Sequence, residues 1–167
     1  AVARVHGVDL WSEAHFEKMR PLMQMLADGG QKVITATLNK DPWNNQCYDA
    51  YADMIIWTKN KDRSWCFDYT LFDRWVEFMM ELGIDRMINC YSLLTWNNQL
   101  HYHDMGKGEQ VTVELKAQSK EYEELWGVFL KDFTHHLREK GWLEKTNIAM
   151  DERGPADMKA ALGVLER

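Results

Sequence analysis

The sequence predicts an α/β fold that forms part of a (β/α)8 barrel of the TIM type. Short apolar, β-branched segments alternate along the chain with amphipathic helical segments. This order is typical of right-handed βαβ units around a parallel sheet. A long segment also follows each of the first two strands before the next helix begins. In barrels, the connections from strand to helix are the ones that carry functional residues.

The first helix and strand are expected over residues 12–30 and 32–38. Ser12 is a favoured N-cap residue, and Gly29 and Gly30 stop the helix. Pro21 lies inside this helix and should kink or interrupt it. The apolar residues of the helix recur at helical spacing, at Phe16, Met19, Met23 and Leu26. The segment KVITATL then has the β-branched character of a buried strand.

The same alternation continues to the end of the chain. Helices are expected over residues 70–83, 120–140 and 156–167, and strands over residues 86–92 and 146–152. The two long segments, residues 39–68 and 93–117, each contain two β-prone stretches around a polar turn or a glycine pair. We therefore predict about three parallel strands with their helices, and two long hairpin-bearing loops.

A complete barrel needs about 250 residues, whereas this chain has 167. We therefore expect residues 1–167 to be a single fragment, the N-terminal half of a barrel with roughly its strands two to four. A small doubly wound open sheet is the alternative. The absence of a Gly-rich phosphate loop after any predicted strand weakens a nucleotide-binding version of that fold.

Composition and charge exclude several kinds of partner. The formal net charge is −6 with scattered Lys and Arg, so we expect no nucleic-acid partner. No apolar run approaches the roughly 20 residues of a membrane span, and the first residues do not resemble a signal peptide. The three cysteines lack metal-ligand spacing. Eight tryptophans are unusual, and some of them are expected to line a binding site for a flat ligand such as a sugar ring.

Two adjacent carboxylates, Asp151 and Glu152, follow the third strand. Neighbouring strand residues point to opposite faces, so the pair shares one pocket only if the backbone bulges or turns at Glu152. Glycosidic bond cleavage uses one group that protonates the leaving oxygen and another that stabilises developing positive charge. The alternative is a carboxylate that caps the next helix beside a Glu–Arg surface pair.

Several segments resemble the catalytic domain of glycoside hydrolase family 123. They are KVITATLNKDPWNNQ, WCFDYTLFDRWVEFMMELGI, INCYS and GVFLKDFTHHLREKGWLEKTNIAMDER. The resemblance implies a secreted, periplasmic or cell-surface enzyme that hydrolyses terminal β-linked N-acetylgalactosamine with retention. It implies substrate-assisted catalysis, in which the acetamido oxygen of the substrate attacks the anomeric carbon. Asp151 would then orient and polarise the acetamido group, and Glu152 would be general acid and then general base.

Further side chains at the strand ends fit a sugar site. Asn89 and Tyr91 share one face of the second strand, Trp96 follows it, and Trp43 and Asn44 follow the first strand. We predict that all five contact the substrate. The alternatives are interior hydrogen bonds of a barrel for Asn89 and Tyr91, and a loop anchor for Trp96.

We expect no metal or other cofactor, because His101 and His103 have no evident third ligand nearby. The expected partners are a glycan or glycoconjugate substrate and either the rest of a parent barrel or a self-association partner. The alternative function is a non-catalytic carbohydrate-binding or structural subdomain of a larger glycosidase.

Overall fold

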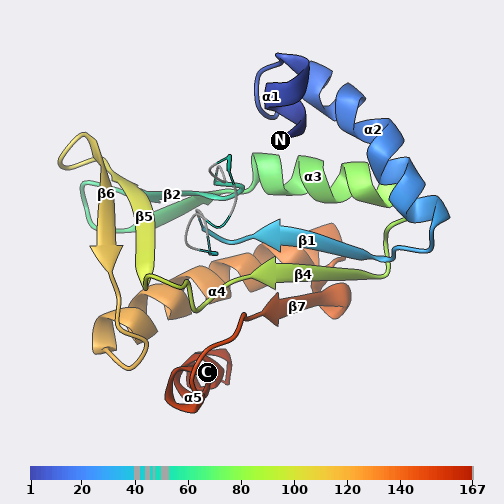
Figure 1. Ribbon diagram of the computed structural model, residues 1–167. Helices are drawn as coiled ribbons and strands as arrows, with labels where there is room; N and C mark the ends of the chain where they lie inside the picture. Colours follow the sequence, from blue (N-terminus) through green and yellow to red (C-terminus); the bar gives the residue numbers. More distant parts are fainter. Residues whose placement is uncertain (40–41, 44–45, 47, 50–52, 167) are drawn as a thin grey trace.

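The computed structural model describes residues 1–39, 42–43, 46, 48–49 and 53–166. Its centre is a parallel sheet of three strands in the order β1-β4-β7, where β1 is Val33–Thr37, β4 is Met87–Tyr91 and β7 is Thr146–Ala149. The three strands lie side by side and point the same way in Figure 1. The predicted parallel strands are therefore confirmed.

Helices lie beside both edge strands of this sheet and behind one of its faces (Figure 1). They are α1 (Val2–His6), α2 (Glu13–Asp28), α3 (Thr70–Glu81), α4 (Lys120–Lys140), the 3-10 turn η1 (Leu143–Lys145) and α5 (Pro155–Leu165). In Figure 1, α2 and α3 lie above β1, α4 passes behind the sheet, and α5 lies below β7. The helices predicted from the sequence are confirmed, and the short α1 was not predicted.

Helix α2 is capped as its sequence predicts, but Pro21 does not interrupt it. The Ser12 hydroxyl accepts the backbone N–H of His15 at 3.2 Å. The helix then runs without a break through Pro21. Pro21 and Glu17, whose carbonyl would normally receive the missing N–H, are both exposed. Water can therefore solvate that carbonyl, so the expectation of an interruption was wrong.

The two long segments form hairpins, as predicted, and the hairpins join into one sheet. The first pairs β2 (Ile56–Lys59) with β3 (Trp65–Asp68), and the second pairs β5 (Gln99–Asp104) with β6 (Glu109–Glu114). Parallel pairing of β2 with β5 gives the order β3-β2-β5-β6. The sequence does not predict this link, because it joins residues 45 positions apart, Thr58 with His103 and Lys59 with Asp104.

The hairpin sheet is anchored to the segment that leaves β1. The buried side chain of Asn39 donates to the His101 carbonyl at 3.0 Å and accepts the His101 N–H at 2.9 Å. The indole N–H of Trp57 donates to the Leu38 carbonyl at 3.0 Å. These contacts hold the hairpin sheet beyond the carboxyl ends of the parallel strands, where Figure 1 shows it.

Replacing Asn39 by Ala leaves the N–H and carbonyl of His101 without this partner. We expect the free energy of unfolding to fall by about 1–3 kcal/mol, because the two hydrogen bonds of the buried Asn39 side chain are lost. Chemical denaturation measures this loss. The matched control is Asn60→Ala in an exposed hairpin turn, where only a hydrogen bond to Ser64 is removed. Equal losses in the two variants would contradict the anchoring role of Asn39.

The two faces of the parallel sheet differ in polarity. Ile34, Ala36, Ile88 and Cys90 have no exposed surface and belong to the core that the helices cover. The opposite face carries a row of three polar side chains in register, Thr35, Asn89 and Asn147. Asn89 is half-buried and the other two are exposed. Solvent therefore reaches the polar face, and the apolar face is packed.

An aromatic cluster joins the hairpin sheet to α4. The Trp57 ring stacks on Phe129 at 4.4 Å between centroids, and Phe129 stacks on Phe133 at 5.2 Å. Trp126 meets Trp57 edge to face at 5.2 Å. Burial of rings this large contributes much of the core energy, so these aromatic residues have structural roles.

Candidate active site

The predicted carboxylates lie in a bend directly after β7. This strand ends at Ala149, earlier than predicted, and the chain bends at Glu152. Asp151 Oδ1 accepts the backbone N–H of Glu152 at 2.9 Å. A side-chain bond of this kind to the local backbone competes with the strand ladder and favours a turn. The turn that both carboxylates need in order to share one site is therefore present.

Two donors hold the Asp151 carboxylate. The Trp96 indole N–H donates to Asp151 Oδ2 at 2.8 Å, and the Glu152 N–H occupies Oδ1. These hydrogen bonds, that of Trp96 first, lower the pKa of Asp151 below its usual range. Asp151 is therefore ionised at neutral pH. A carboxylate has about four acceptor positions, so capacity remains for a substrate donor.

Glu152 is exposed, and its carboxylate makes no hydrogen bond or ion pair with any residue that the structure describes. Helix α5 begins at Pro155 with Gly154 as N-cap and no side-chain cap. The adjacent residue in the chain, Arg153, pairs with Asp157 at 2.9 Å. The alternative of a helix-capping carboxylate beside a Glu–Arg pair is therefore wrong, and Glu152 is available to a ligand.

Arg153 is a residue of this site that the sequence analysis missed. Its side chain is 10% exposed. Nη1 donates to the carbonyls of Thr95 at 2.7 Å and Trp96 at 3.1 Å. Nη2 donates to Asn98 Oδ1 at 2.9 Å and to Asp157 Oδ2 at 2.9 Å. Arg153 thereby joins the segment after β7 to the loop between β4 and β5.

The other predicted residues form two groups. Trp96, which contacts Asp151, is 37% exposed, and it is the only exposed one of the eight tryptophans, all of which are described. Trp43 packs against Tyr91, with the ring centroids 5.2 Å apart. Tyr91 ends β4 in register with Ala149, which precedes the carboxylates by two residues. The two groups therefore lie at the carboxyl ends of the neighbouring strands β4 and β7.

Asn89 lies on the same strand face as Tyr91, two residues before it. It is half-buried in the polar row of the sheet. Its side chain points to the face that solvent reaches, which keeps it a candidate substrate contact below Tyr91. Asn44 lies outside the described residues.

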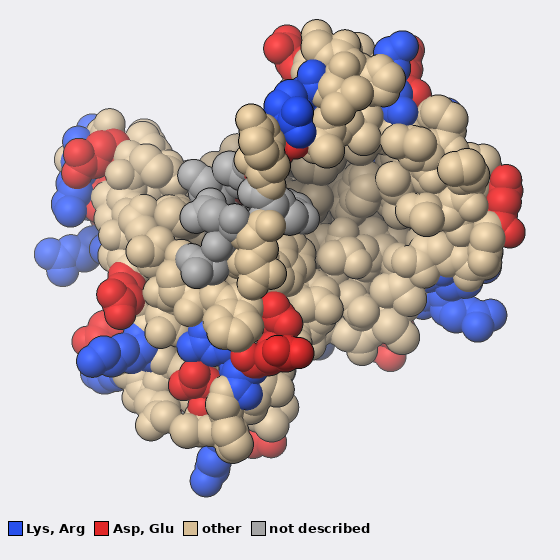
Figure 2. Space-filling model, viewed as in Figure 1, with Lys and Arg blue, Asp and Glu red and all other residues tan. Residues whose placement is uncertain are grey.

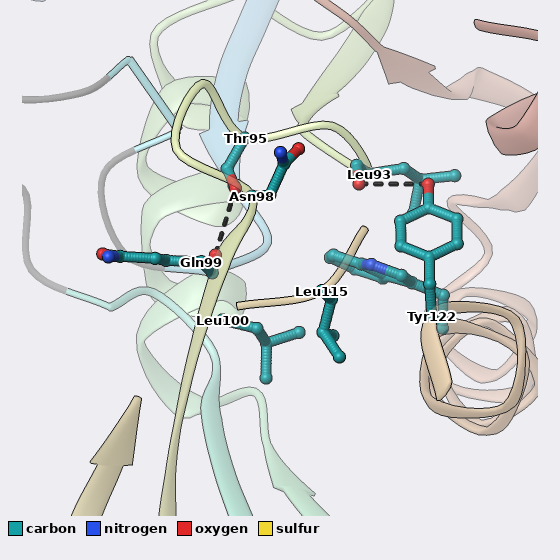
Figure 3. Close-up of a pocket in the computed structure, with 8 residues that line it drawn as sticks. Leu93, Thr95, Asn98, Gln99, Leu100, Leu115 and Tyr122 are labelled. Atoms are coloured by element: carbon teal, nitrogen blue, oxygen red, sulfur yellow. Dashed lines mark hydrogen bonds between the residues drawn. The ribbon is translucent and has the colours of Figure 1, made fainter. Parts of the chain in front are cut away.

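A small cavity lies beneath the loop that carries Trp96. It has a volume of about 10 Å³ and is lined by residues of the β4–β5 loop, β5, Leu115 and α4. Figure 3 shows the Tyr122 hydroxyl bonded to the Leu93 carbonyl, and Thr95 bonded to the Gln99 carbonyl, at this cavity. The volume suits about one water molecule. It is too small for a sugar ring, so its residues support the loop.

On the face shown in Figure 2, charged side chains of both signs are scattered. No group of three His, Cys, Asp or Glu side chains is placed to hold a metal within the described ranges. His101 Nδ1 lies 2.7 Å from the Thr112 hydroxyl. None of the helices in those ranges is long and apolar enough to cross a membrane.

The sequence gives only a weak indication of the contacts that Arg153 makes. Asp157 follows Arg153 by four residues, the spacing at which side chains meet on a helix. Nothing in the sequence indicates that the fork of Arg153 reaches Thr95 and Asn98, since 58 and 55 positions separate these residues from it.

Comparison with known proteins assigns the family. A family model described as "Glycoside hydrolase 123, catalytic domain" matches residues 1–167. Among solved structures, the chain resembles a family 123 glycoside hydrolase from Clostridium perfringens that was studied for glycolipid glycan hydrolysis. The TM-score is 0.93 at 34% sequence identity, and the match covers 99% of this chain and 30% of that one. The comparison with curated proteins gave no match. The chain belongs to the glycoside hydrolase 123 catalytic-domain family.

Proposed function

We propose that this chain carries the catalytic carboxylates of a β-N-acetylhexosaminidase that releases terminal β-linked N-acetylgalactosamine with retention. One observation carries the proposal. An ionised Asp151, held by two N–H donors, lies next to an exposed and unengaged Glu152 in a bend after a parallel strand. Family membership makes glycoside hydrolysis the reaction class that this pair serves.

Asp151 stabilises positive charge in this mechanism. The acetamido oxygen of the substrate attacks the anomeric carbon, the glycosidic bond breaks, and the acetamido group becomes a cationic oxazolinium ring. A carboxylate that accepts the acetamido N–H opposes this charge and aligns the oxygen for attack. The hydrogen bonds from Trp96 and the Glu152 backbone keep Asp151 anionic and fix its direction.

Glu152 moves the protons. It donates a proton to the leaving oxygen as the glycosidic bond breaks, and it then takes a proton from the water that opens the oxazolinium ring. The product is the free sugar with its original anomeric configuration, because two inversions occur. The exposure of Glu152 allows it to reach both the leaving group and the attacking water.

The aromatic and amide side chains around the pair supply the sugar contacts. Trp96 offers a ring face for stacking on the apolar side of a sugar. Trp43 and Tyr91 form a second aromatic surface, and Tyr91 and Asn89 supply hydrogen-bonding groups on one strand face. We propose Asn44 for the same role on the basis of the family resemblance.

We also propose that the chain is the N-terminal half of a (β/α)8 barrel, roughly its strands two to four. The chain spans 30% of the Clostridium enzyme. The polar row of Thr35, Asn89 and Asn147 suits the interior of a barrel. Next to β7, an apolar groove of about 740 Å³ between α4 and α5, lined in part by Leu130 and Ile148, suits the packing of a further βα unit. The remaining strands would complete the substrate site.

Two further points follow from the same proposal. The glycan of a glycolipid is a candidate substrate, because the Clostridium enzyme was studied with glycolipid glycans. We also propose a secreted, periplasmic or cell-surface location, on the basis of the family resemblance alone.

The anomeric configuration of the first product tests the mechanism. We expect the β-anomer of N-acetylgalactosamine to appear first and to equilibrate later with the α-anomer. Proton NMR during hydrolysis of an aryl β-N-acetylgalactosaminide by the full-length protein measures this order. If the α-anomer appears first, the retaining mechanism is wrong. Release of N-acetylglucosamine but not N-acetylgalactosamine would change the assigned sugar and keep the reaction class.

The alternative is a carbohydrate-binding subdomain without turnover. The 30% coverage of the Clostridium enzyme favours it for the 167 residues taken alone. Titration of the isolated chain with N-acetylgalactosamine, followed by NMR shifts of Trp96 and Tyr91, tests this function. If the 167 residues bind the sugar without hydrolysing a glycoside, and the full-length protein hydrolyses it, then this chain suffices for binding and catalysis needs the longer protein.

A further inference from the structure

The loop that carries Trp96 is joined to the segment after β7 by the guanidinium group of Arg153, in addition to the bond from the Trp96 indole to Asp151. Arg153 donates to the carbonyls of Thr95 and Trp96 and to the side chain of Asn98, at 2.7–3.1 Å. A planar fork with donors on both nitrogens holds such acceptors in one geometry, which an ammonium group does not reproduce. The position of the loop relative to β7 therefore depends on Arg153.

Asp157 in turn fixes the guanidinium. Asp157 Oδ2 accepts from Nη2 at 2.9 Å and from Nε at 3.3 Å. The Arg153 side chain is 10% exposed, so its charge is largely removed from water and compensated by this partner. The guanidinium carbon also lies 5.8 Å from the centre of the Trp96 ring. A contact at this distance favours one orientation of the indole.

The orientation of Trp96 decides whether its N–H meets Asp151. The indole nitrogen has a single hydrogen, which donates to Asp151 Oδ2 at 2.8 Å. A rotation of the ring or a shift of the loop would break this bond, while the Glu152 N–H on Oδ1 would remain because it belongs to the same local turn. The Trp96 bond is thus the contact of Asp151 that comes from another part of the fold.

Resting on the function proposed above, we propose that Arg153 and Trp96 are positioning residues for the catalytic carboxylate. Arg153 sets the place of the Trp96 indole, and the indole N–H sets the direction and charge of Asp151. Neither residue has to touch the reacting atoms for this role. Arg153 acts through Trp96, and Trp96 acts through Asp151.

Few ionisable groups lie in the two described segments that hold Asp151. The segment after β7 supplies Glu152, Arg153 and Asp157, and residues 92–98 of the β4–β5 loop contain none. Removal of the Arg153 charge would by itself raise the pKa of Asp151. The variant Arg153→Lys avoids this ambiguity, because it keeps the charge and loses the fork.

The test measures the pKa of Asp151 by carboxyl carbon NMR in the folded, substrate-free protein. We expect the pKa of Asp151 to rise toward its ordinary value in Trp96→Phe, which keeps an aromatic ring without the N–H. We expect a rise in the same direction in Arg153→Lys and Arg153→Met. The matched control is Arg86→Met, because Arg86 is exposed and directly precedes β4, at the end of the strand away from Asp151. The pKa of Asp151 in this control should equal that of the wild type.

Kinetics give the second readout. Arg153→Met should lower kcat on an aryl β-N-acetylgalactosaminide by about 100-fold, the effect of misplacing a reacting group by about 1 Å. In Arg153→Met, KM should change much less than kcat. In Trp96→Phe and Arg153→Lys, the acid limb of the pH profile of kcat/KM should move to higher pH. A merely structural Arg153 would lower thermal stability without moving this limb.

The two readouts separate this inference from the proposed function. If the wild type hydrolyses no β-N-acetylhexosaminide, the function fails, and the NMR titration still tests the positioning. Should Arg153→Met not fold, Asn98→Ala removes one acceptor of the fork and is expected to raise the pKa of Asp151 by less. A pKa of Asp151 equal to that of the wild type in folded Arg153→Lys and Asn98→Ala would overturn the role of Arg153.

Discussion

Replacement of Glu152 by Gln is expected to lower kcat for β-N-acetylgalactosaminide hydrolysis by about 10²–10⁴-fold, the usual contribution of a general acid or base. The change keeps the size of the side chain and removes the exchangeable carboxyl proton. The side chain of Glu152 makes no hydrogen bond with the described residues, so the fold should tolerate the substitution. Initial rates with substrates of different leaving groups measure the effect.

The leaving group shows which step Glu152 serves. A phenol that leaves readily needs little protonation, whereas a sugar or alkyl alcohol needs a full proton transfer. The loss in Glu152→Gln should therefore be largest for poor leaving groups. Glu17 is exposed on α2, and Glu17→Gln is the matched control that should keep the wild-type rate. A loss that is equal for all leaving groups would argue against a general acid at this position.

Replacement of Asp151 by Asn should lower kcat by about 10²–10³-fold, as expected when one preorganised electrostatic contact to the transition state is lost. The amide is similar in shape and can still accept the Trp96 N–H through its oxygen. It carries no negative charge to oppose the oxazolinium ring. Steady-state kinetics of the purified variant measure the loss. The control is Asp85→Asn, at an exposed position two residues before β4.

The ionisation of Asp151 also predicts how activity depends on pH. The hydrogen bonds from Trp96 and the Glu152 N–H hold the pKa of Asp151 below its usual value of about 4. Asp151 is active as the anion, so its contribution is complete above that pKa and is lost as the pH falls through it. The acid limb due to Asp151 should therefore lie below about pH 4, and it should disappear in Asp151→Asn. An unchanged acid limb in the variant would assign it to another group.

The chemistry of the substrate provides an independent check on Asp151. Fluorine on the acetamido methyl group makes the carbonyl oxygen a weaker nucleophile. The wild-type rate should fall steadily from the acetamido to the trifluoroacetamido substrate if this oxygen attacks the anomeric carbon. A rate that does not depend on fluorination would point to an enzyme carboxylate as nucleophile instead.

Local patterns predicted most of the elements of this fold. The helical spacing of Phe72, Trp75 and Phe78 and the β-branched run of residues 33–37 depend only on neighbours in the chain, and both elements are present. The turn at Glu152 is also local, because Asp151 bonds to the next backbone N–H. Features of this kind can be predicted from sequence because their partners lie within a few residues.

Long-range contacts could not be predicted in this way. The pairing of β2 with β5 and the Asn39–His101 hydrogen bonds join residues about 45 to 62 positions apart. Arg153 likewise reaches back to Thr95, over 58 positions. Its identity as an arginine is visible in the sequence, but the acceptors that define its role are set only by the tertiary fold. Trp96 could be named as a candidate from the sequence, because it lies in the loop that follows a predicted strand.

The most direct test of the central proposal is hydrolysis of a chromogenic β-N-acetylgalactosaminide by the full-length protein. It compares wild type, Glu152→Gln and the Glu17→Gln control, with the β-N-acetylglucosaminide in parallel. We predict that wild type and control release the chromophore, faster from the galactosaminide, and that Glu152→Gln loses at least about 100-fold in rate. A wild-type protein inert on both substrates, or a Glu152→Gln variant as fast as the control, would contradict the assignment of this chain as the carrier of the catalytic acid/base.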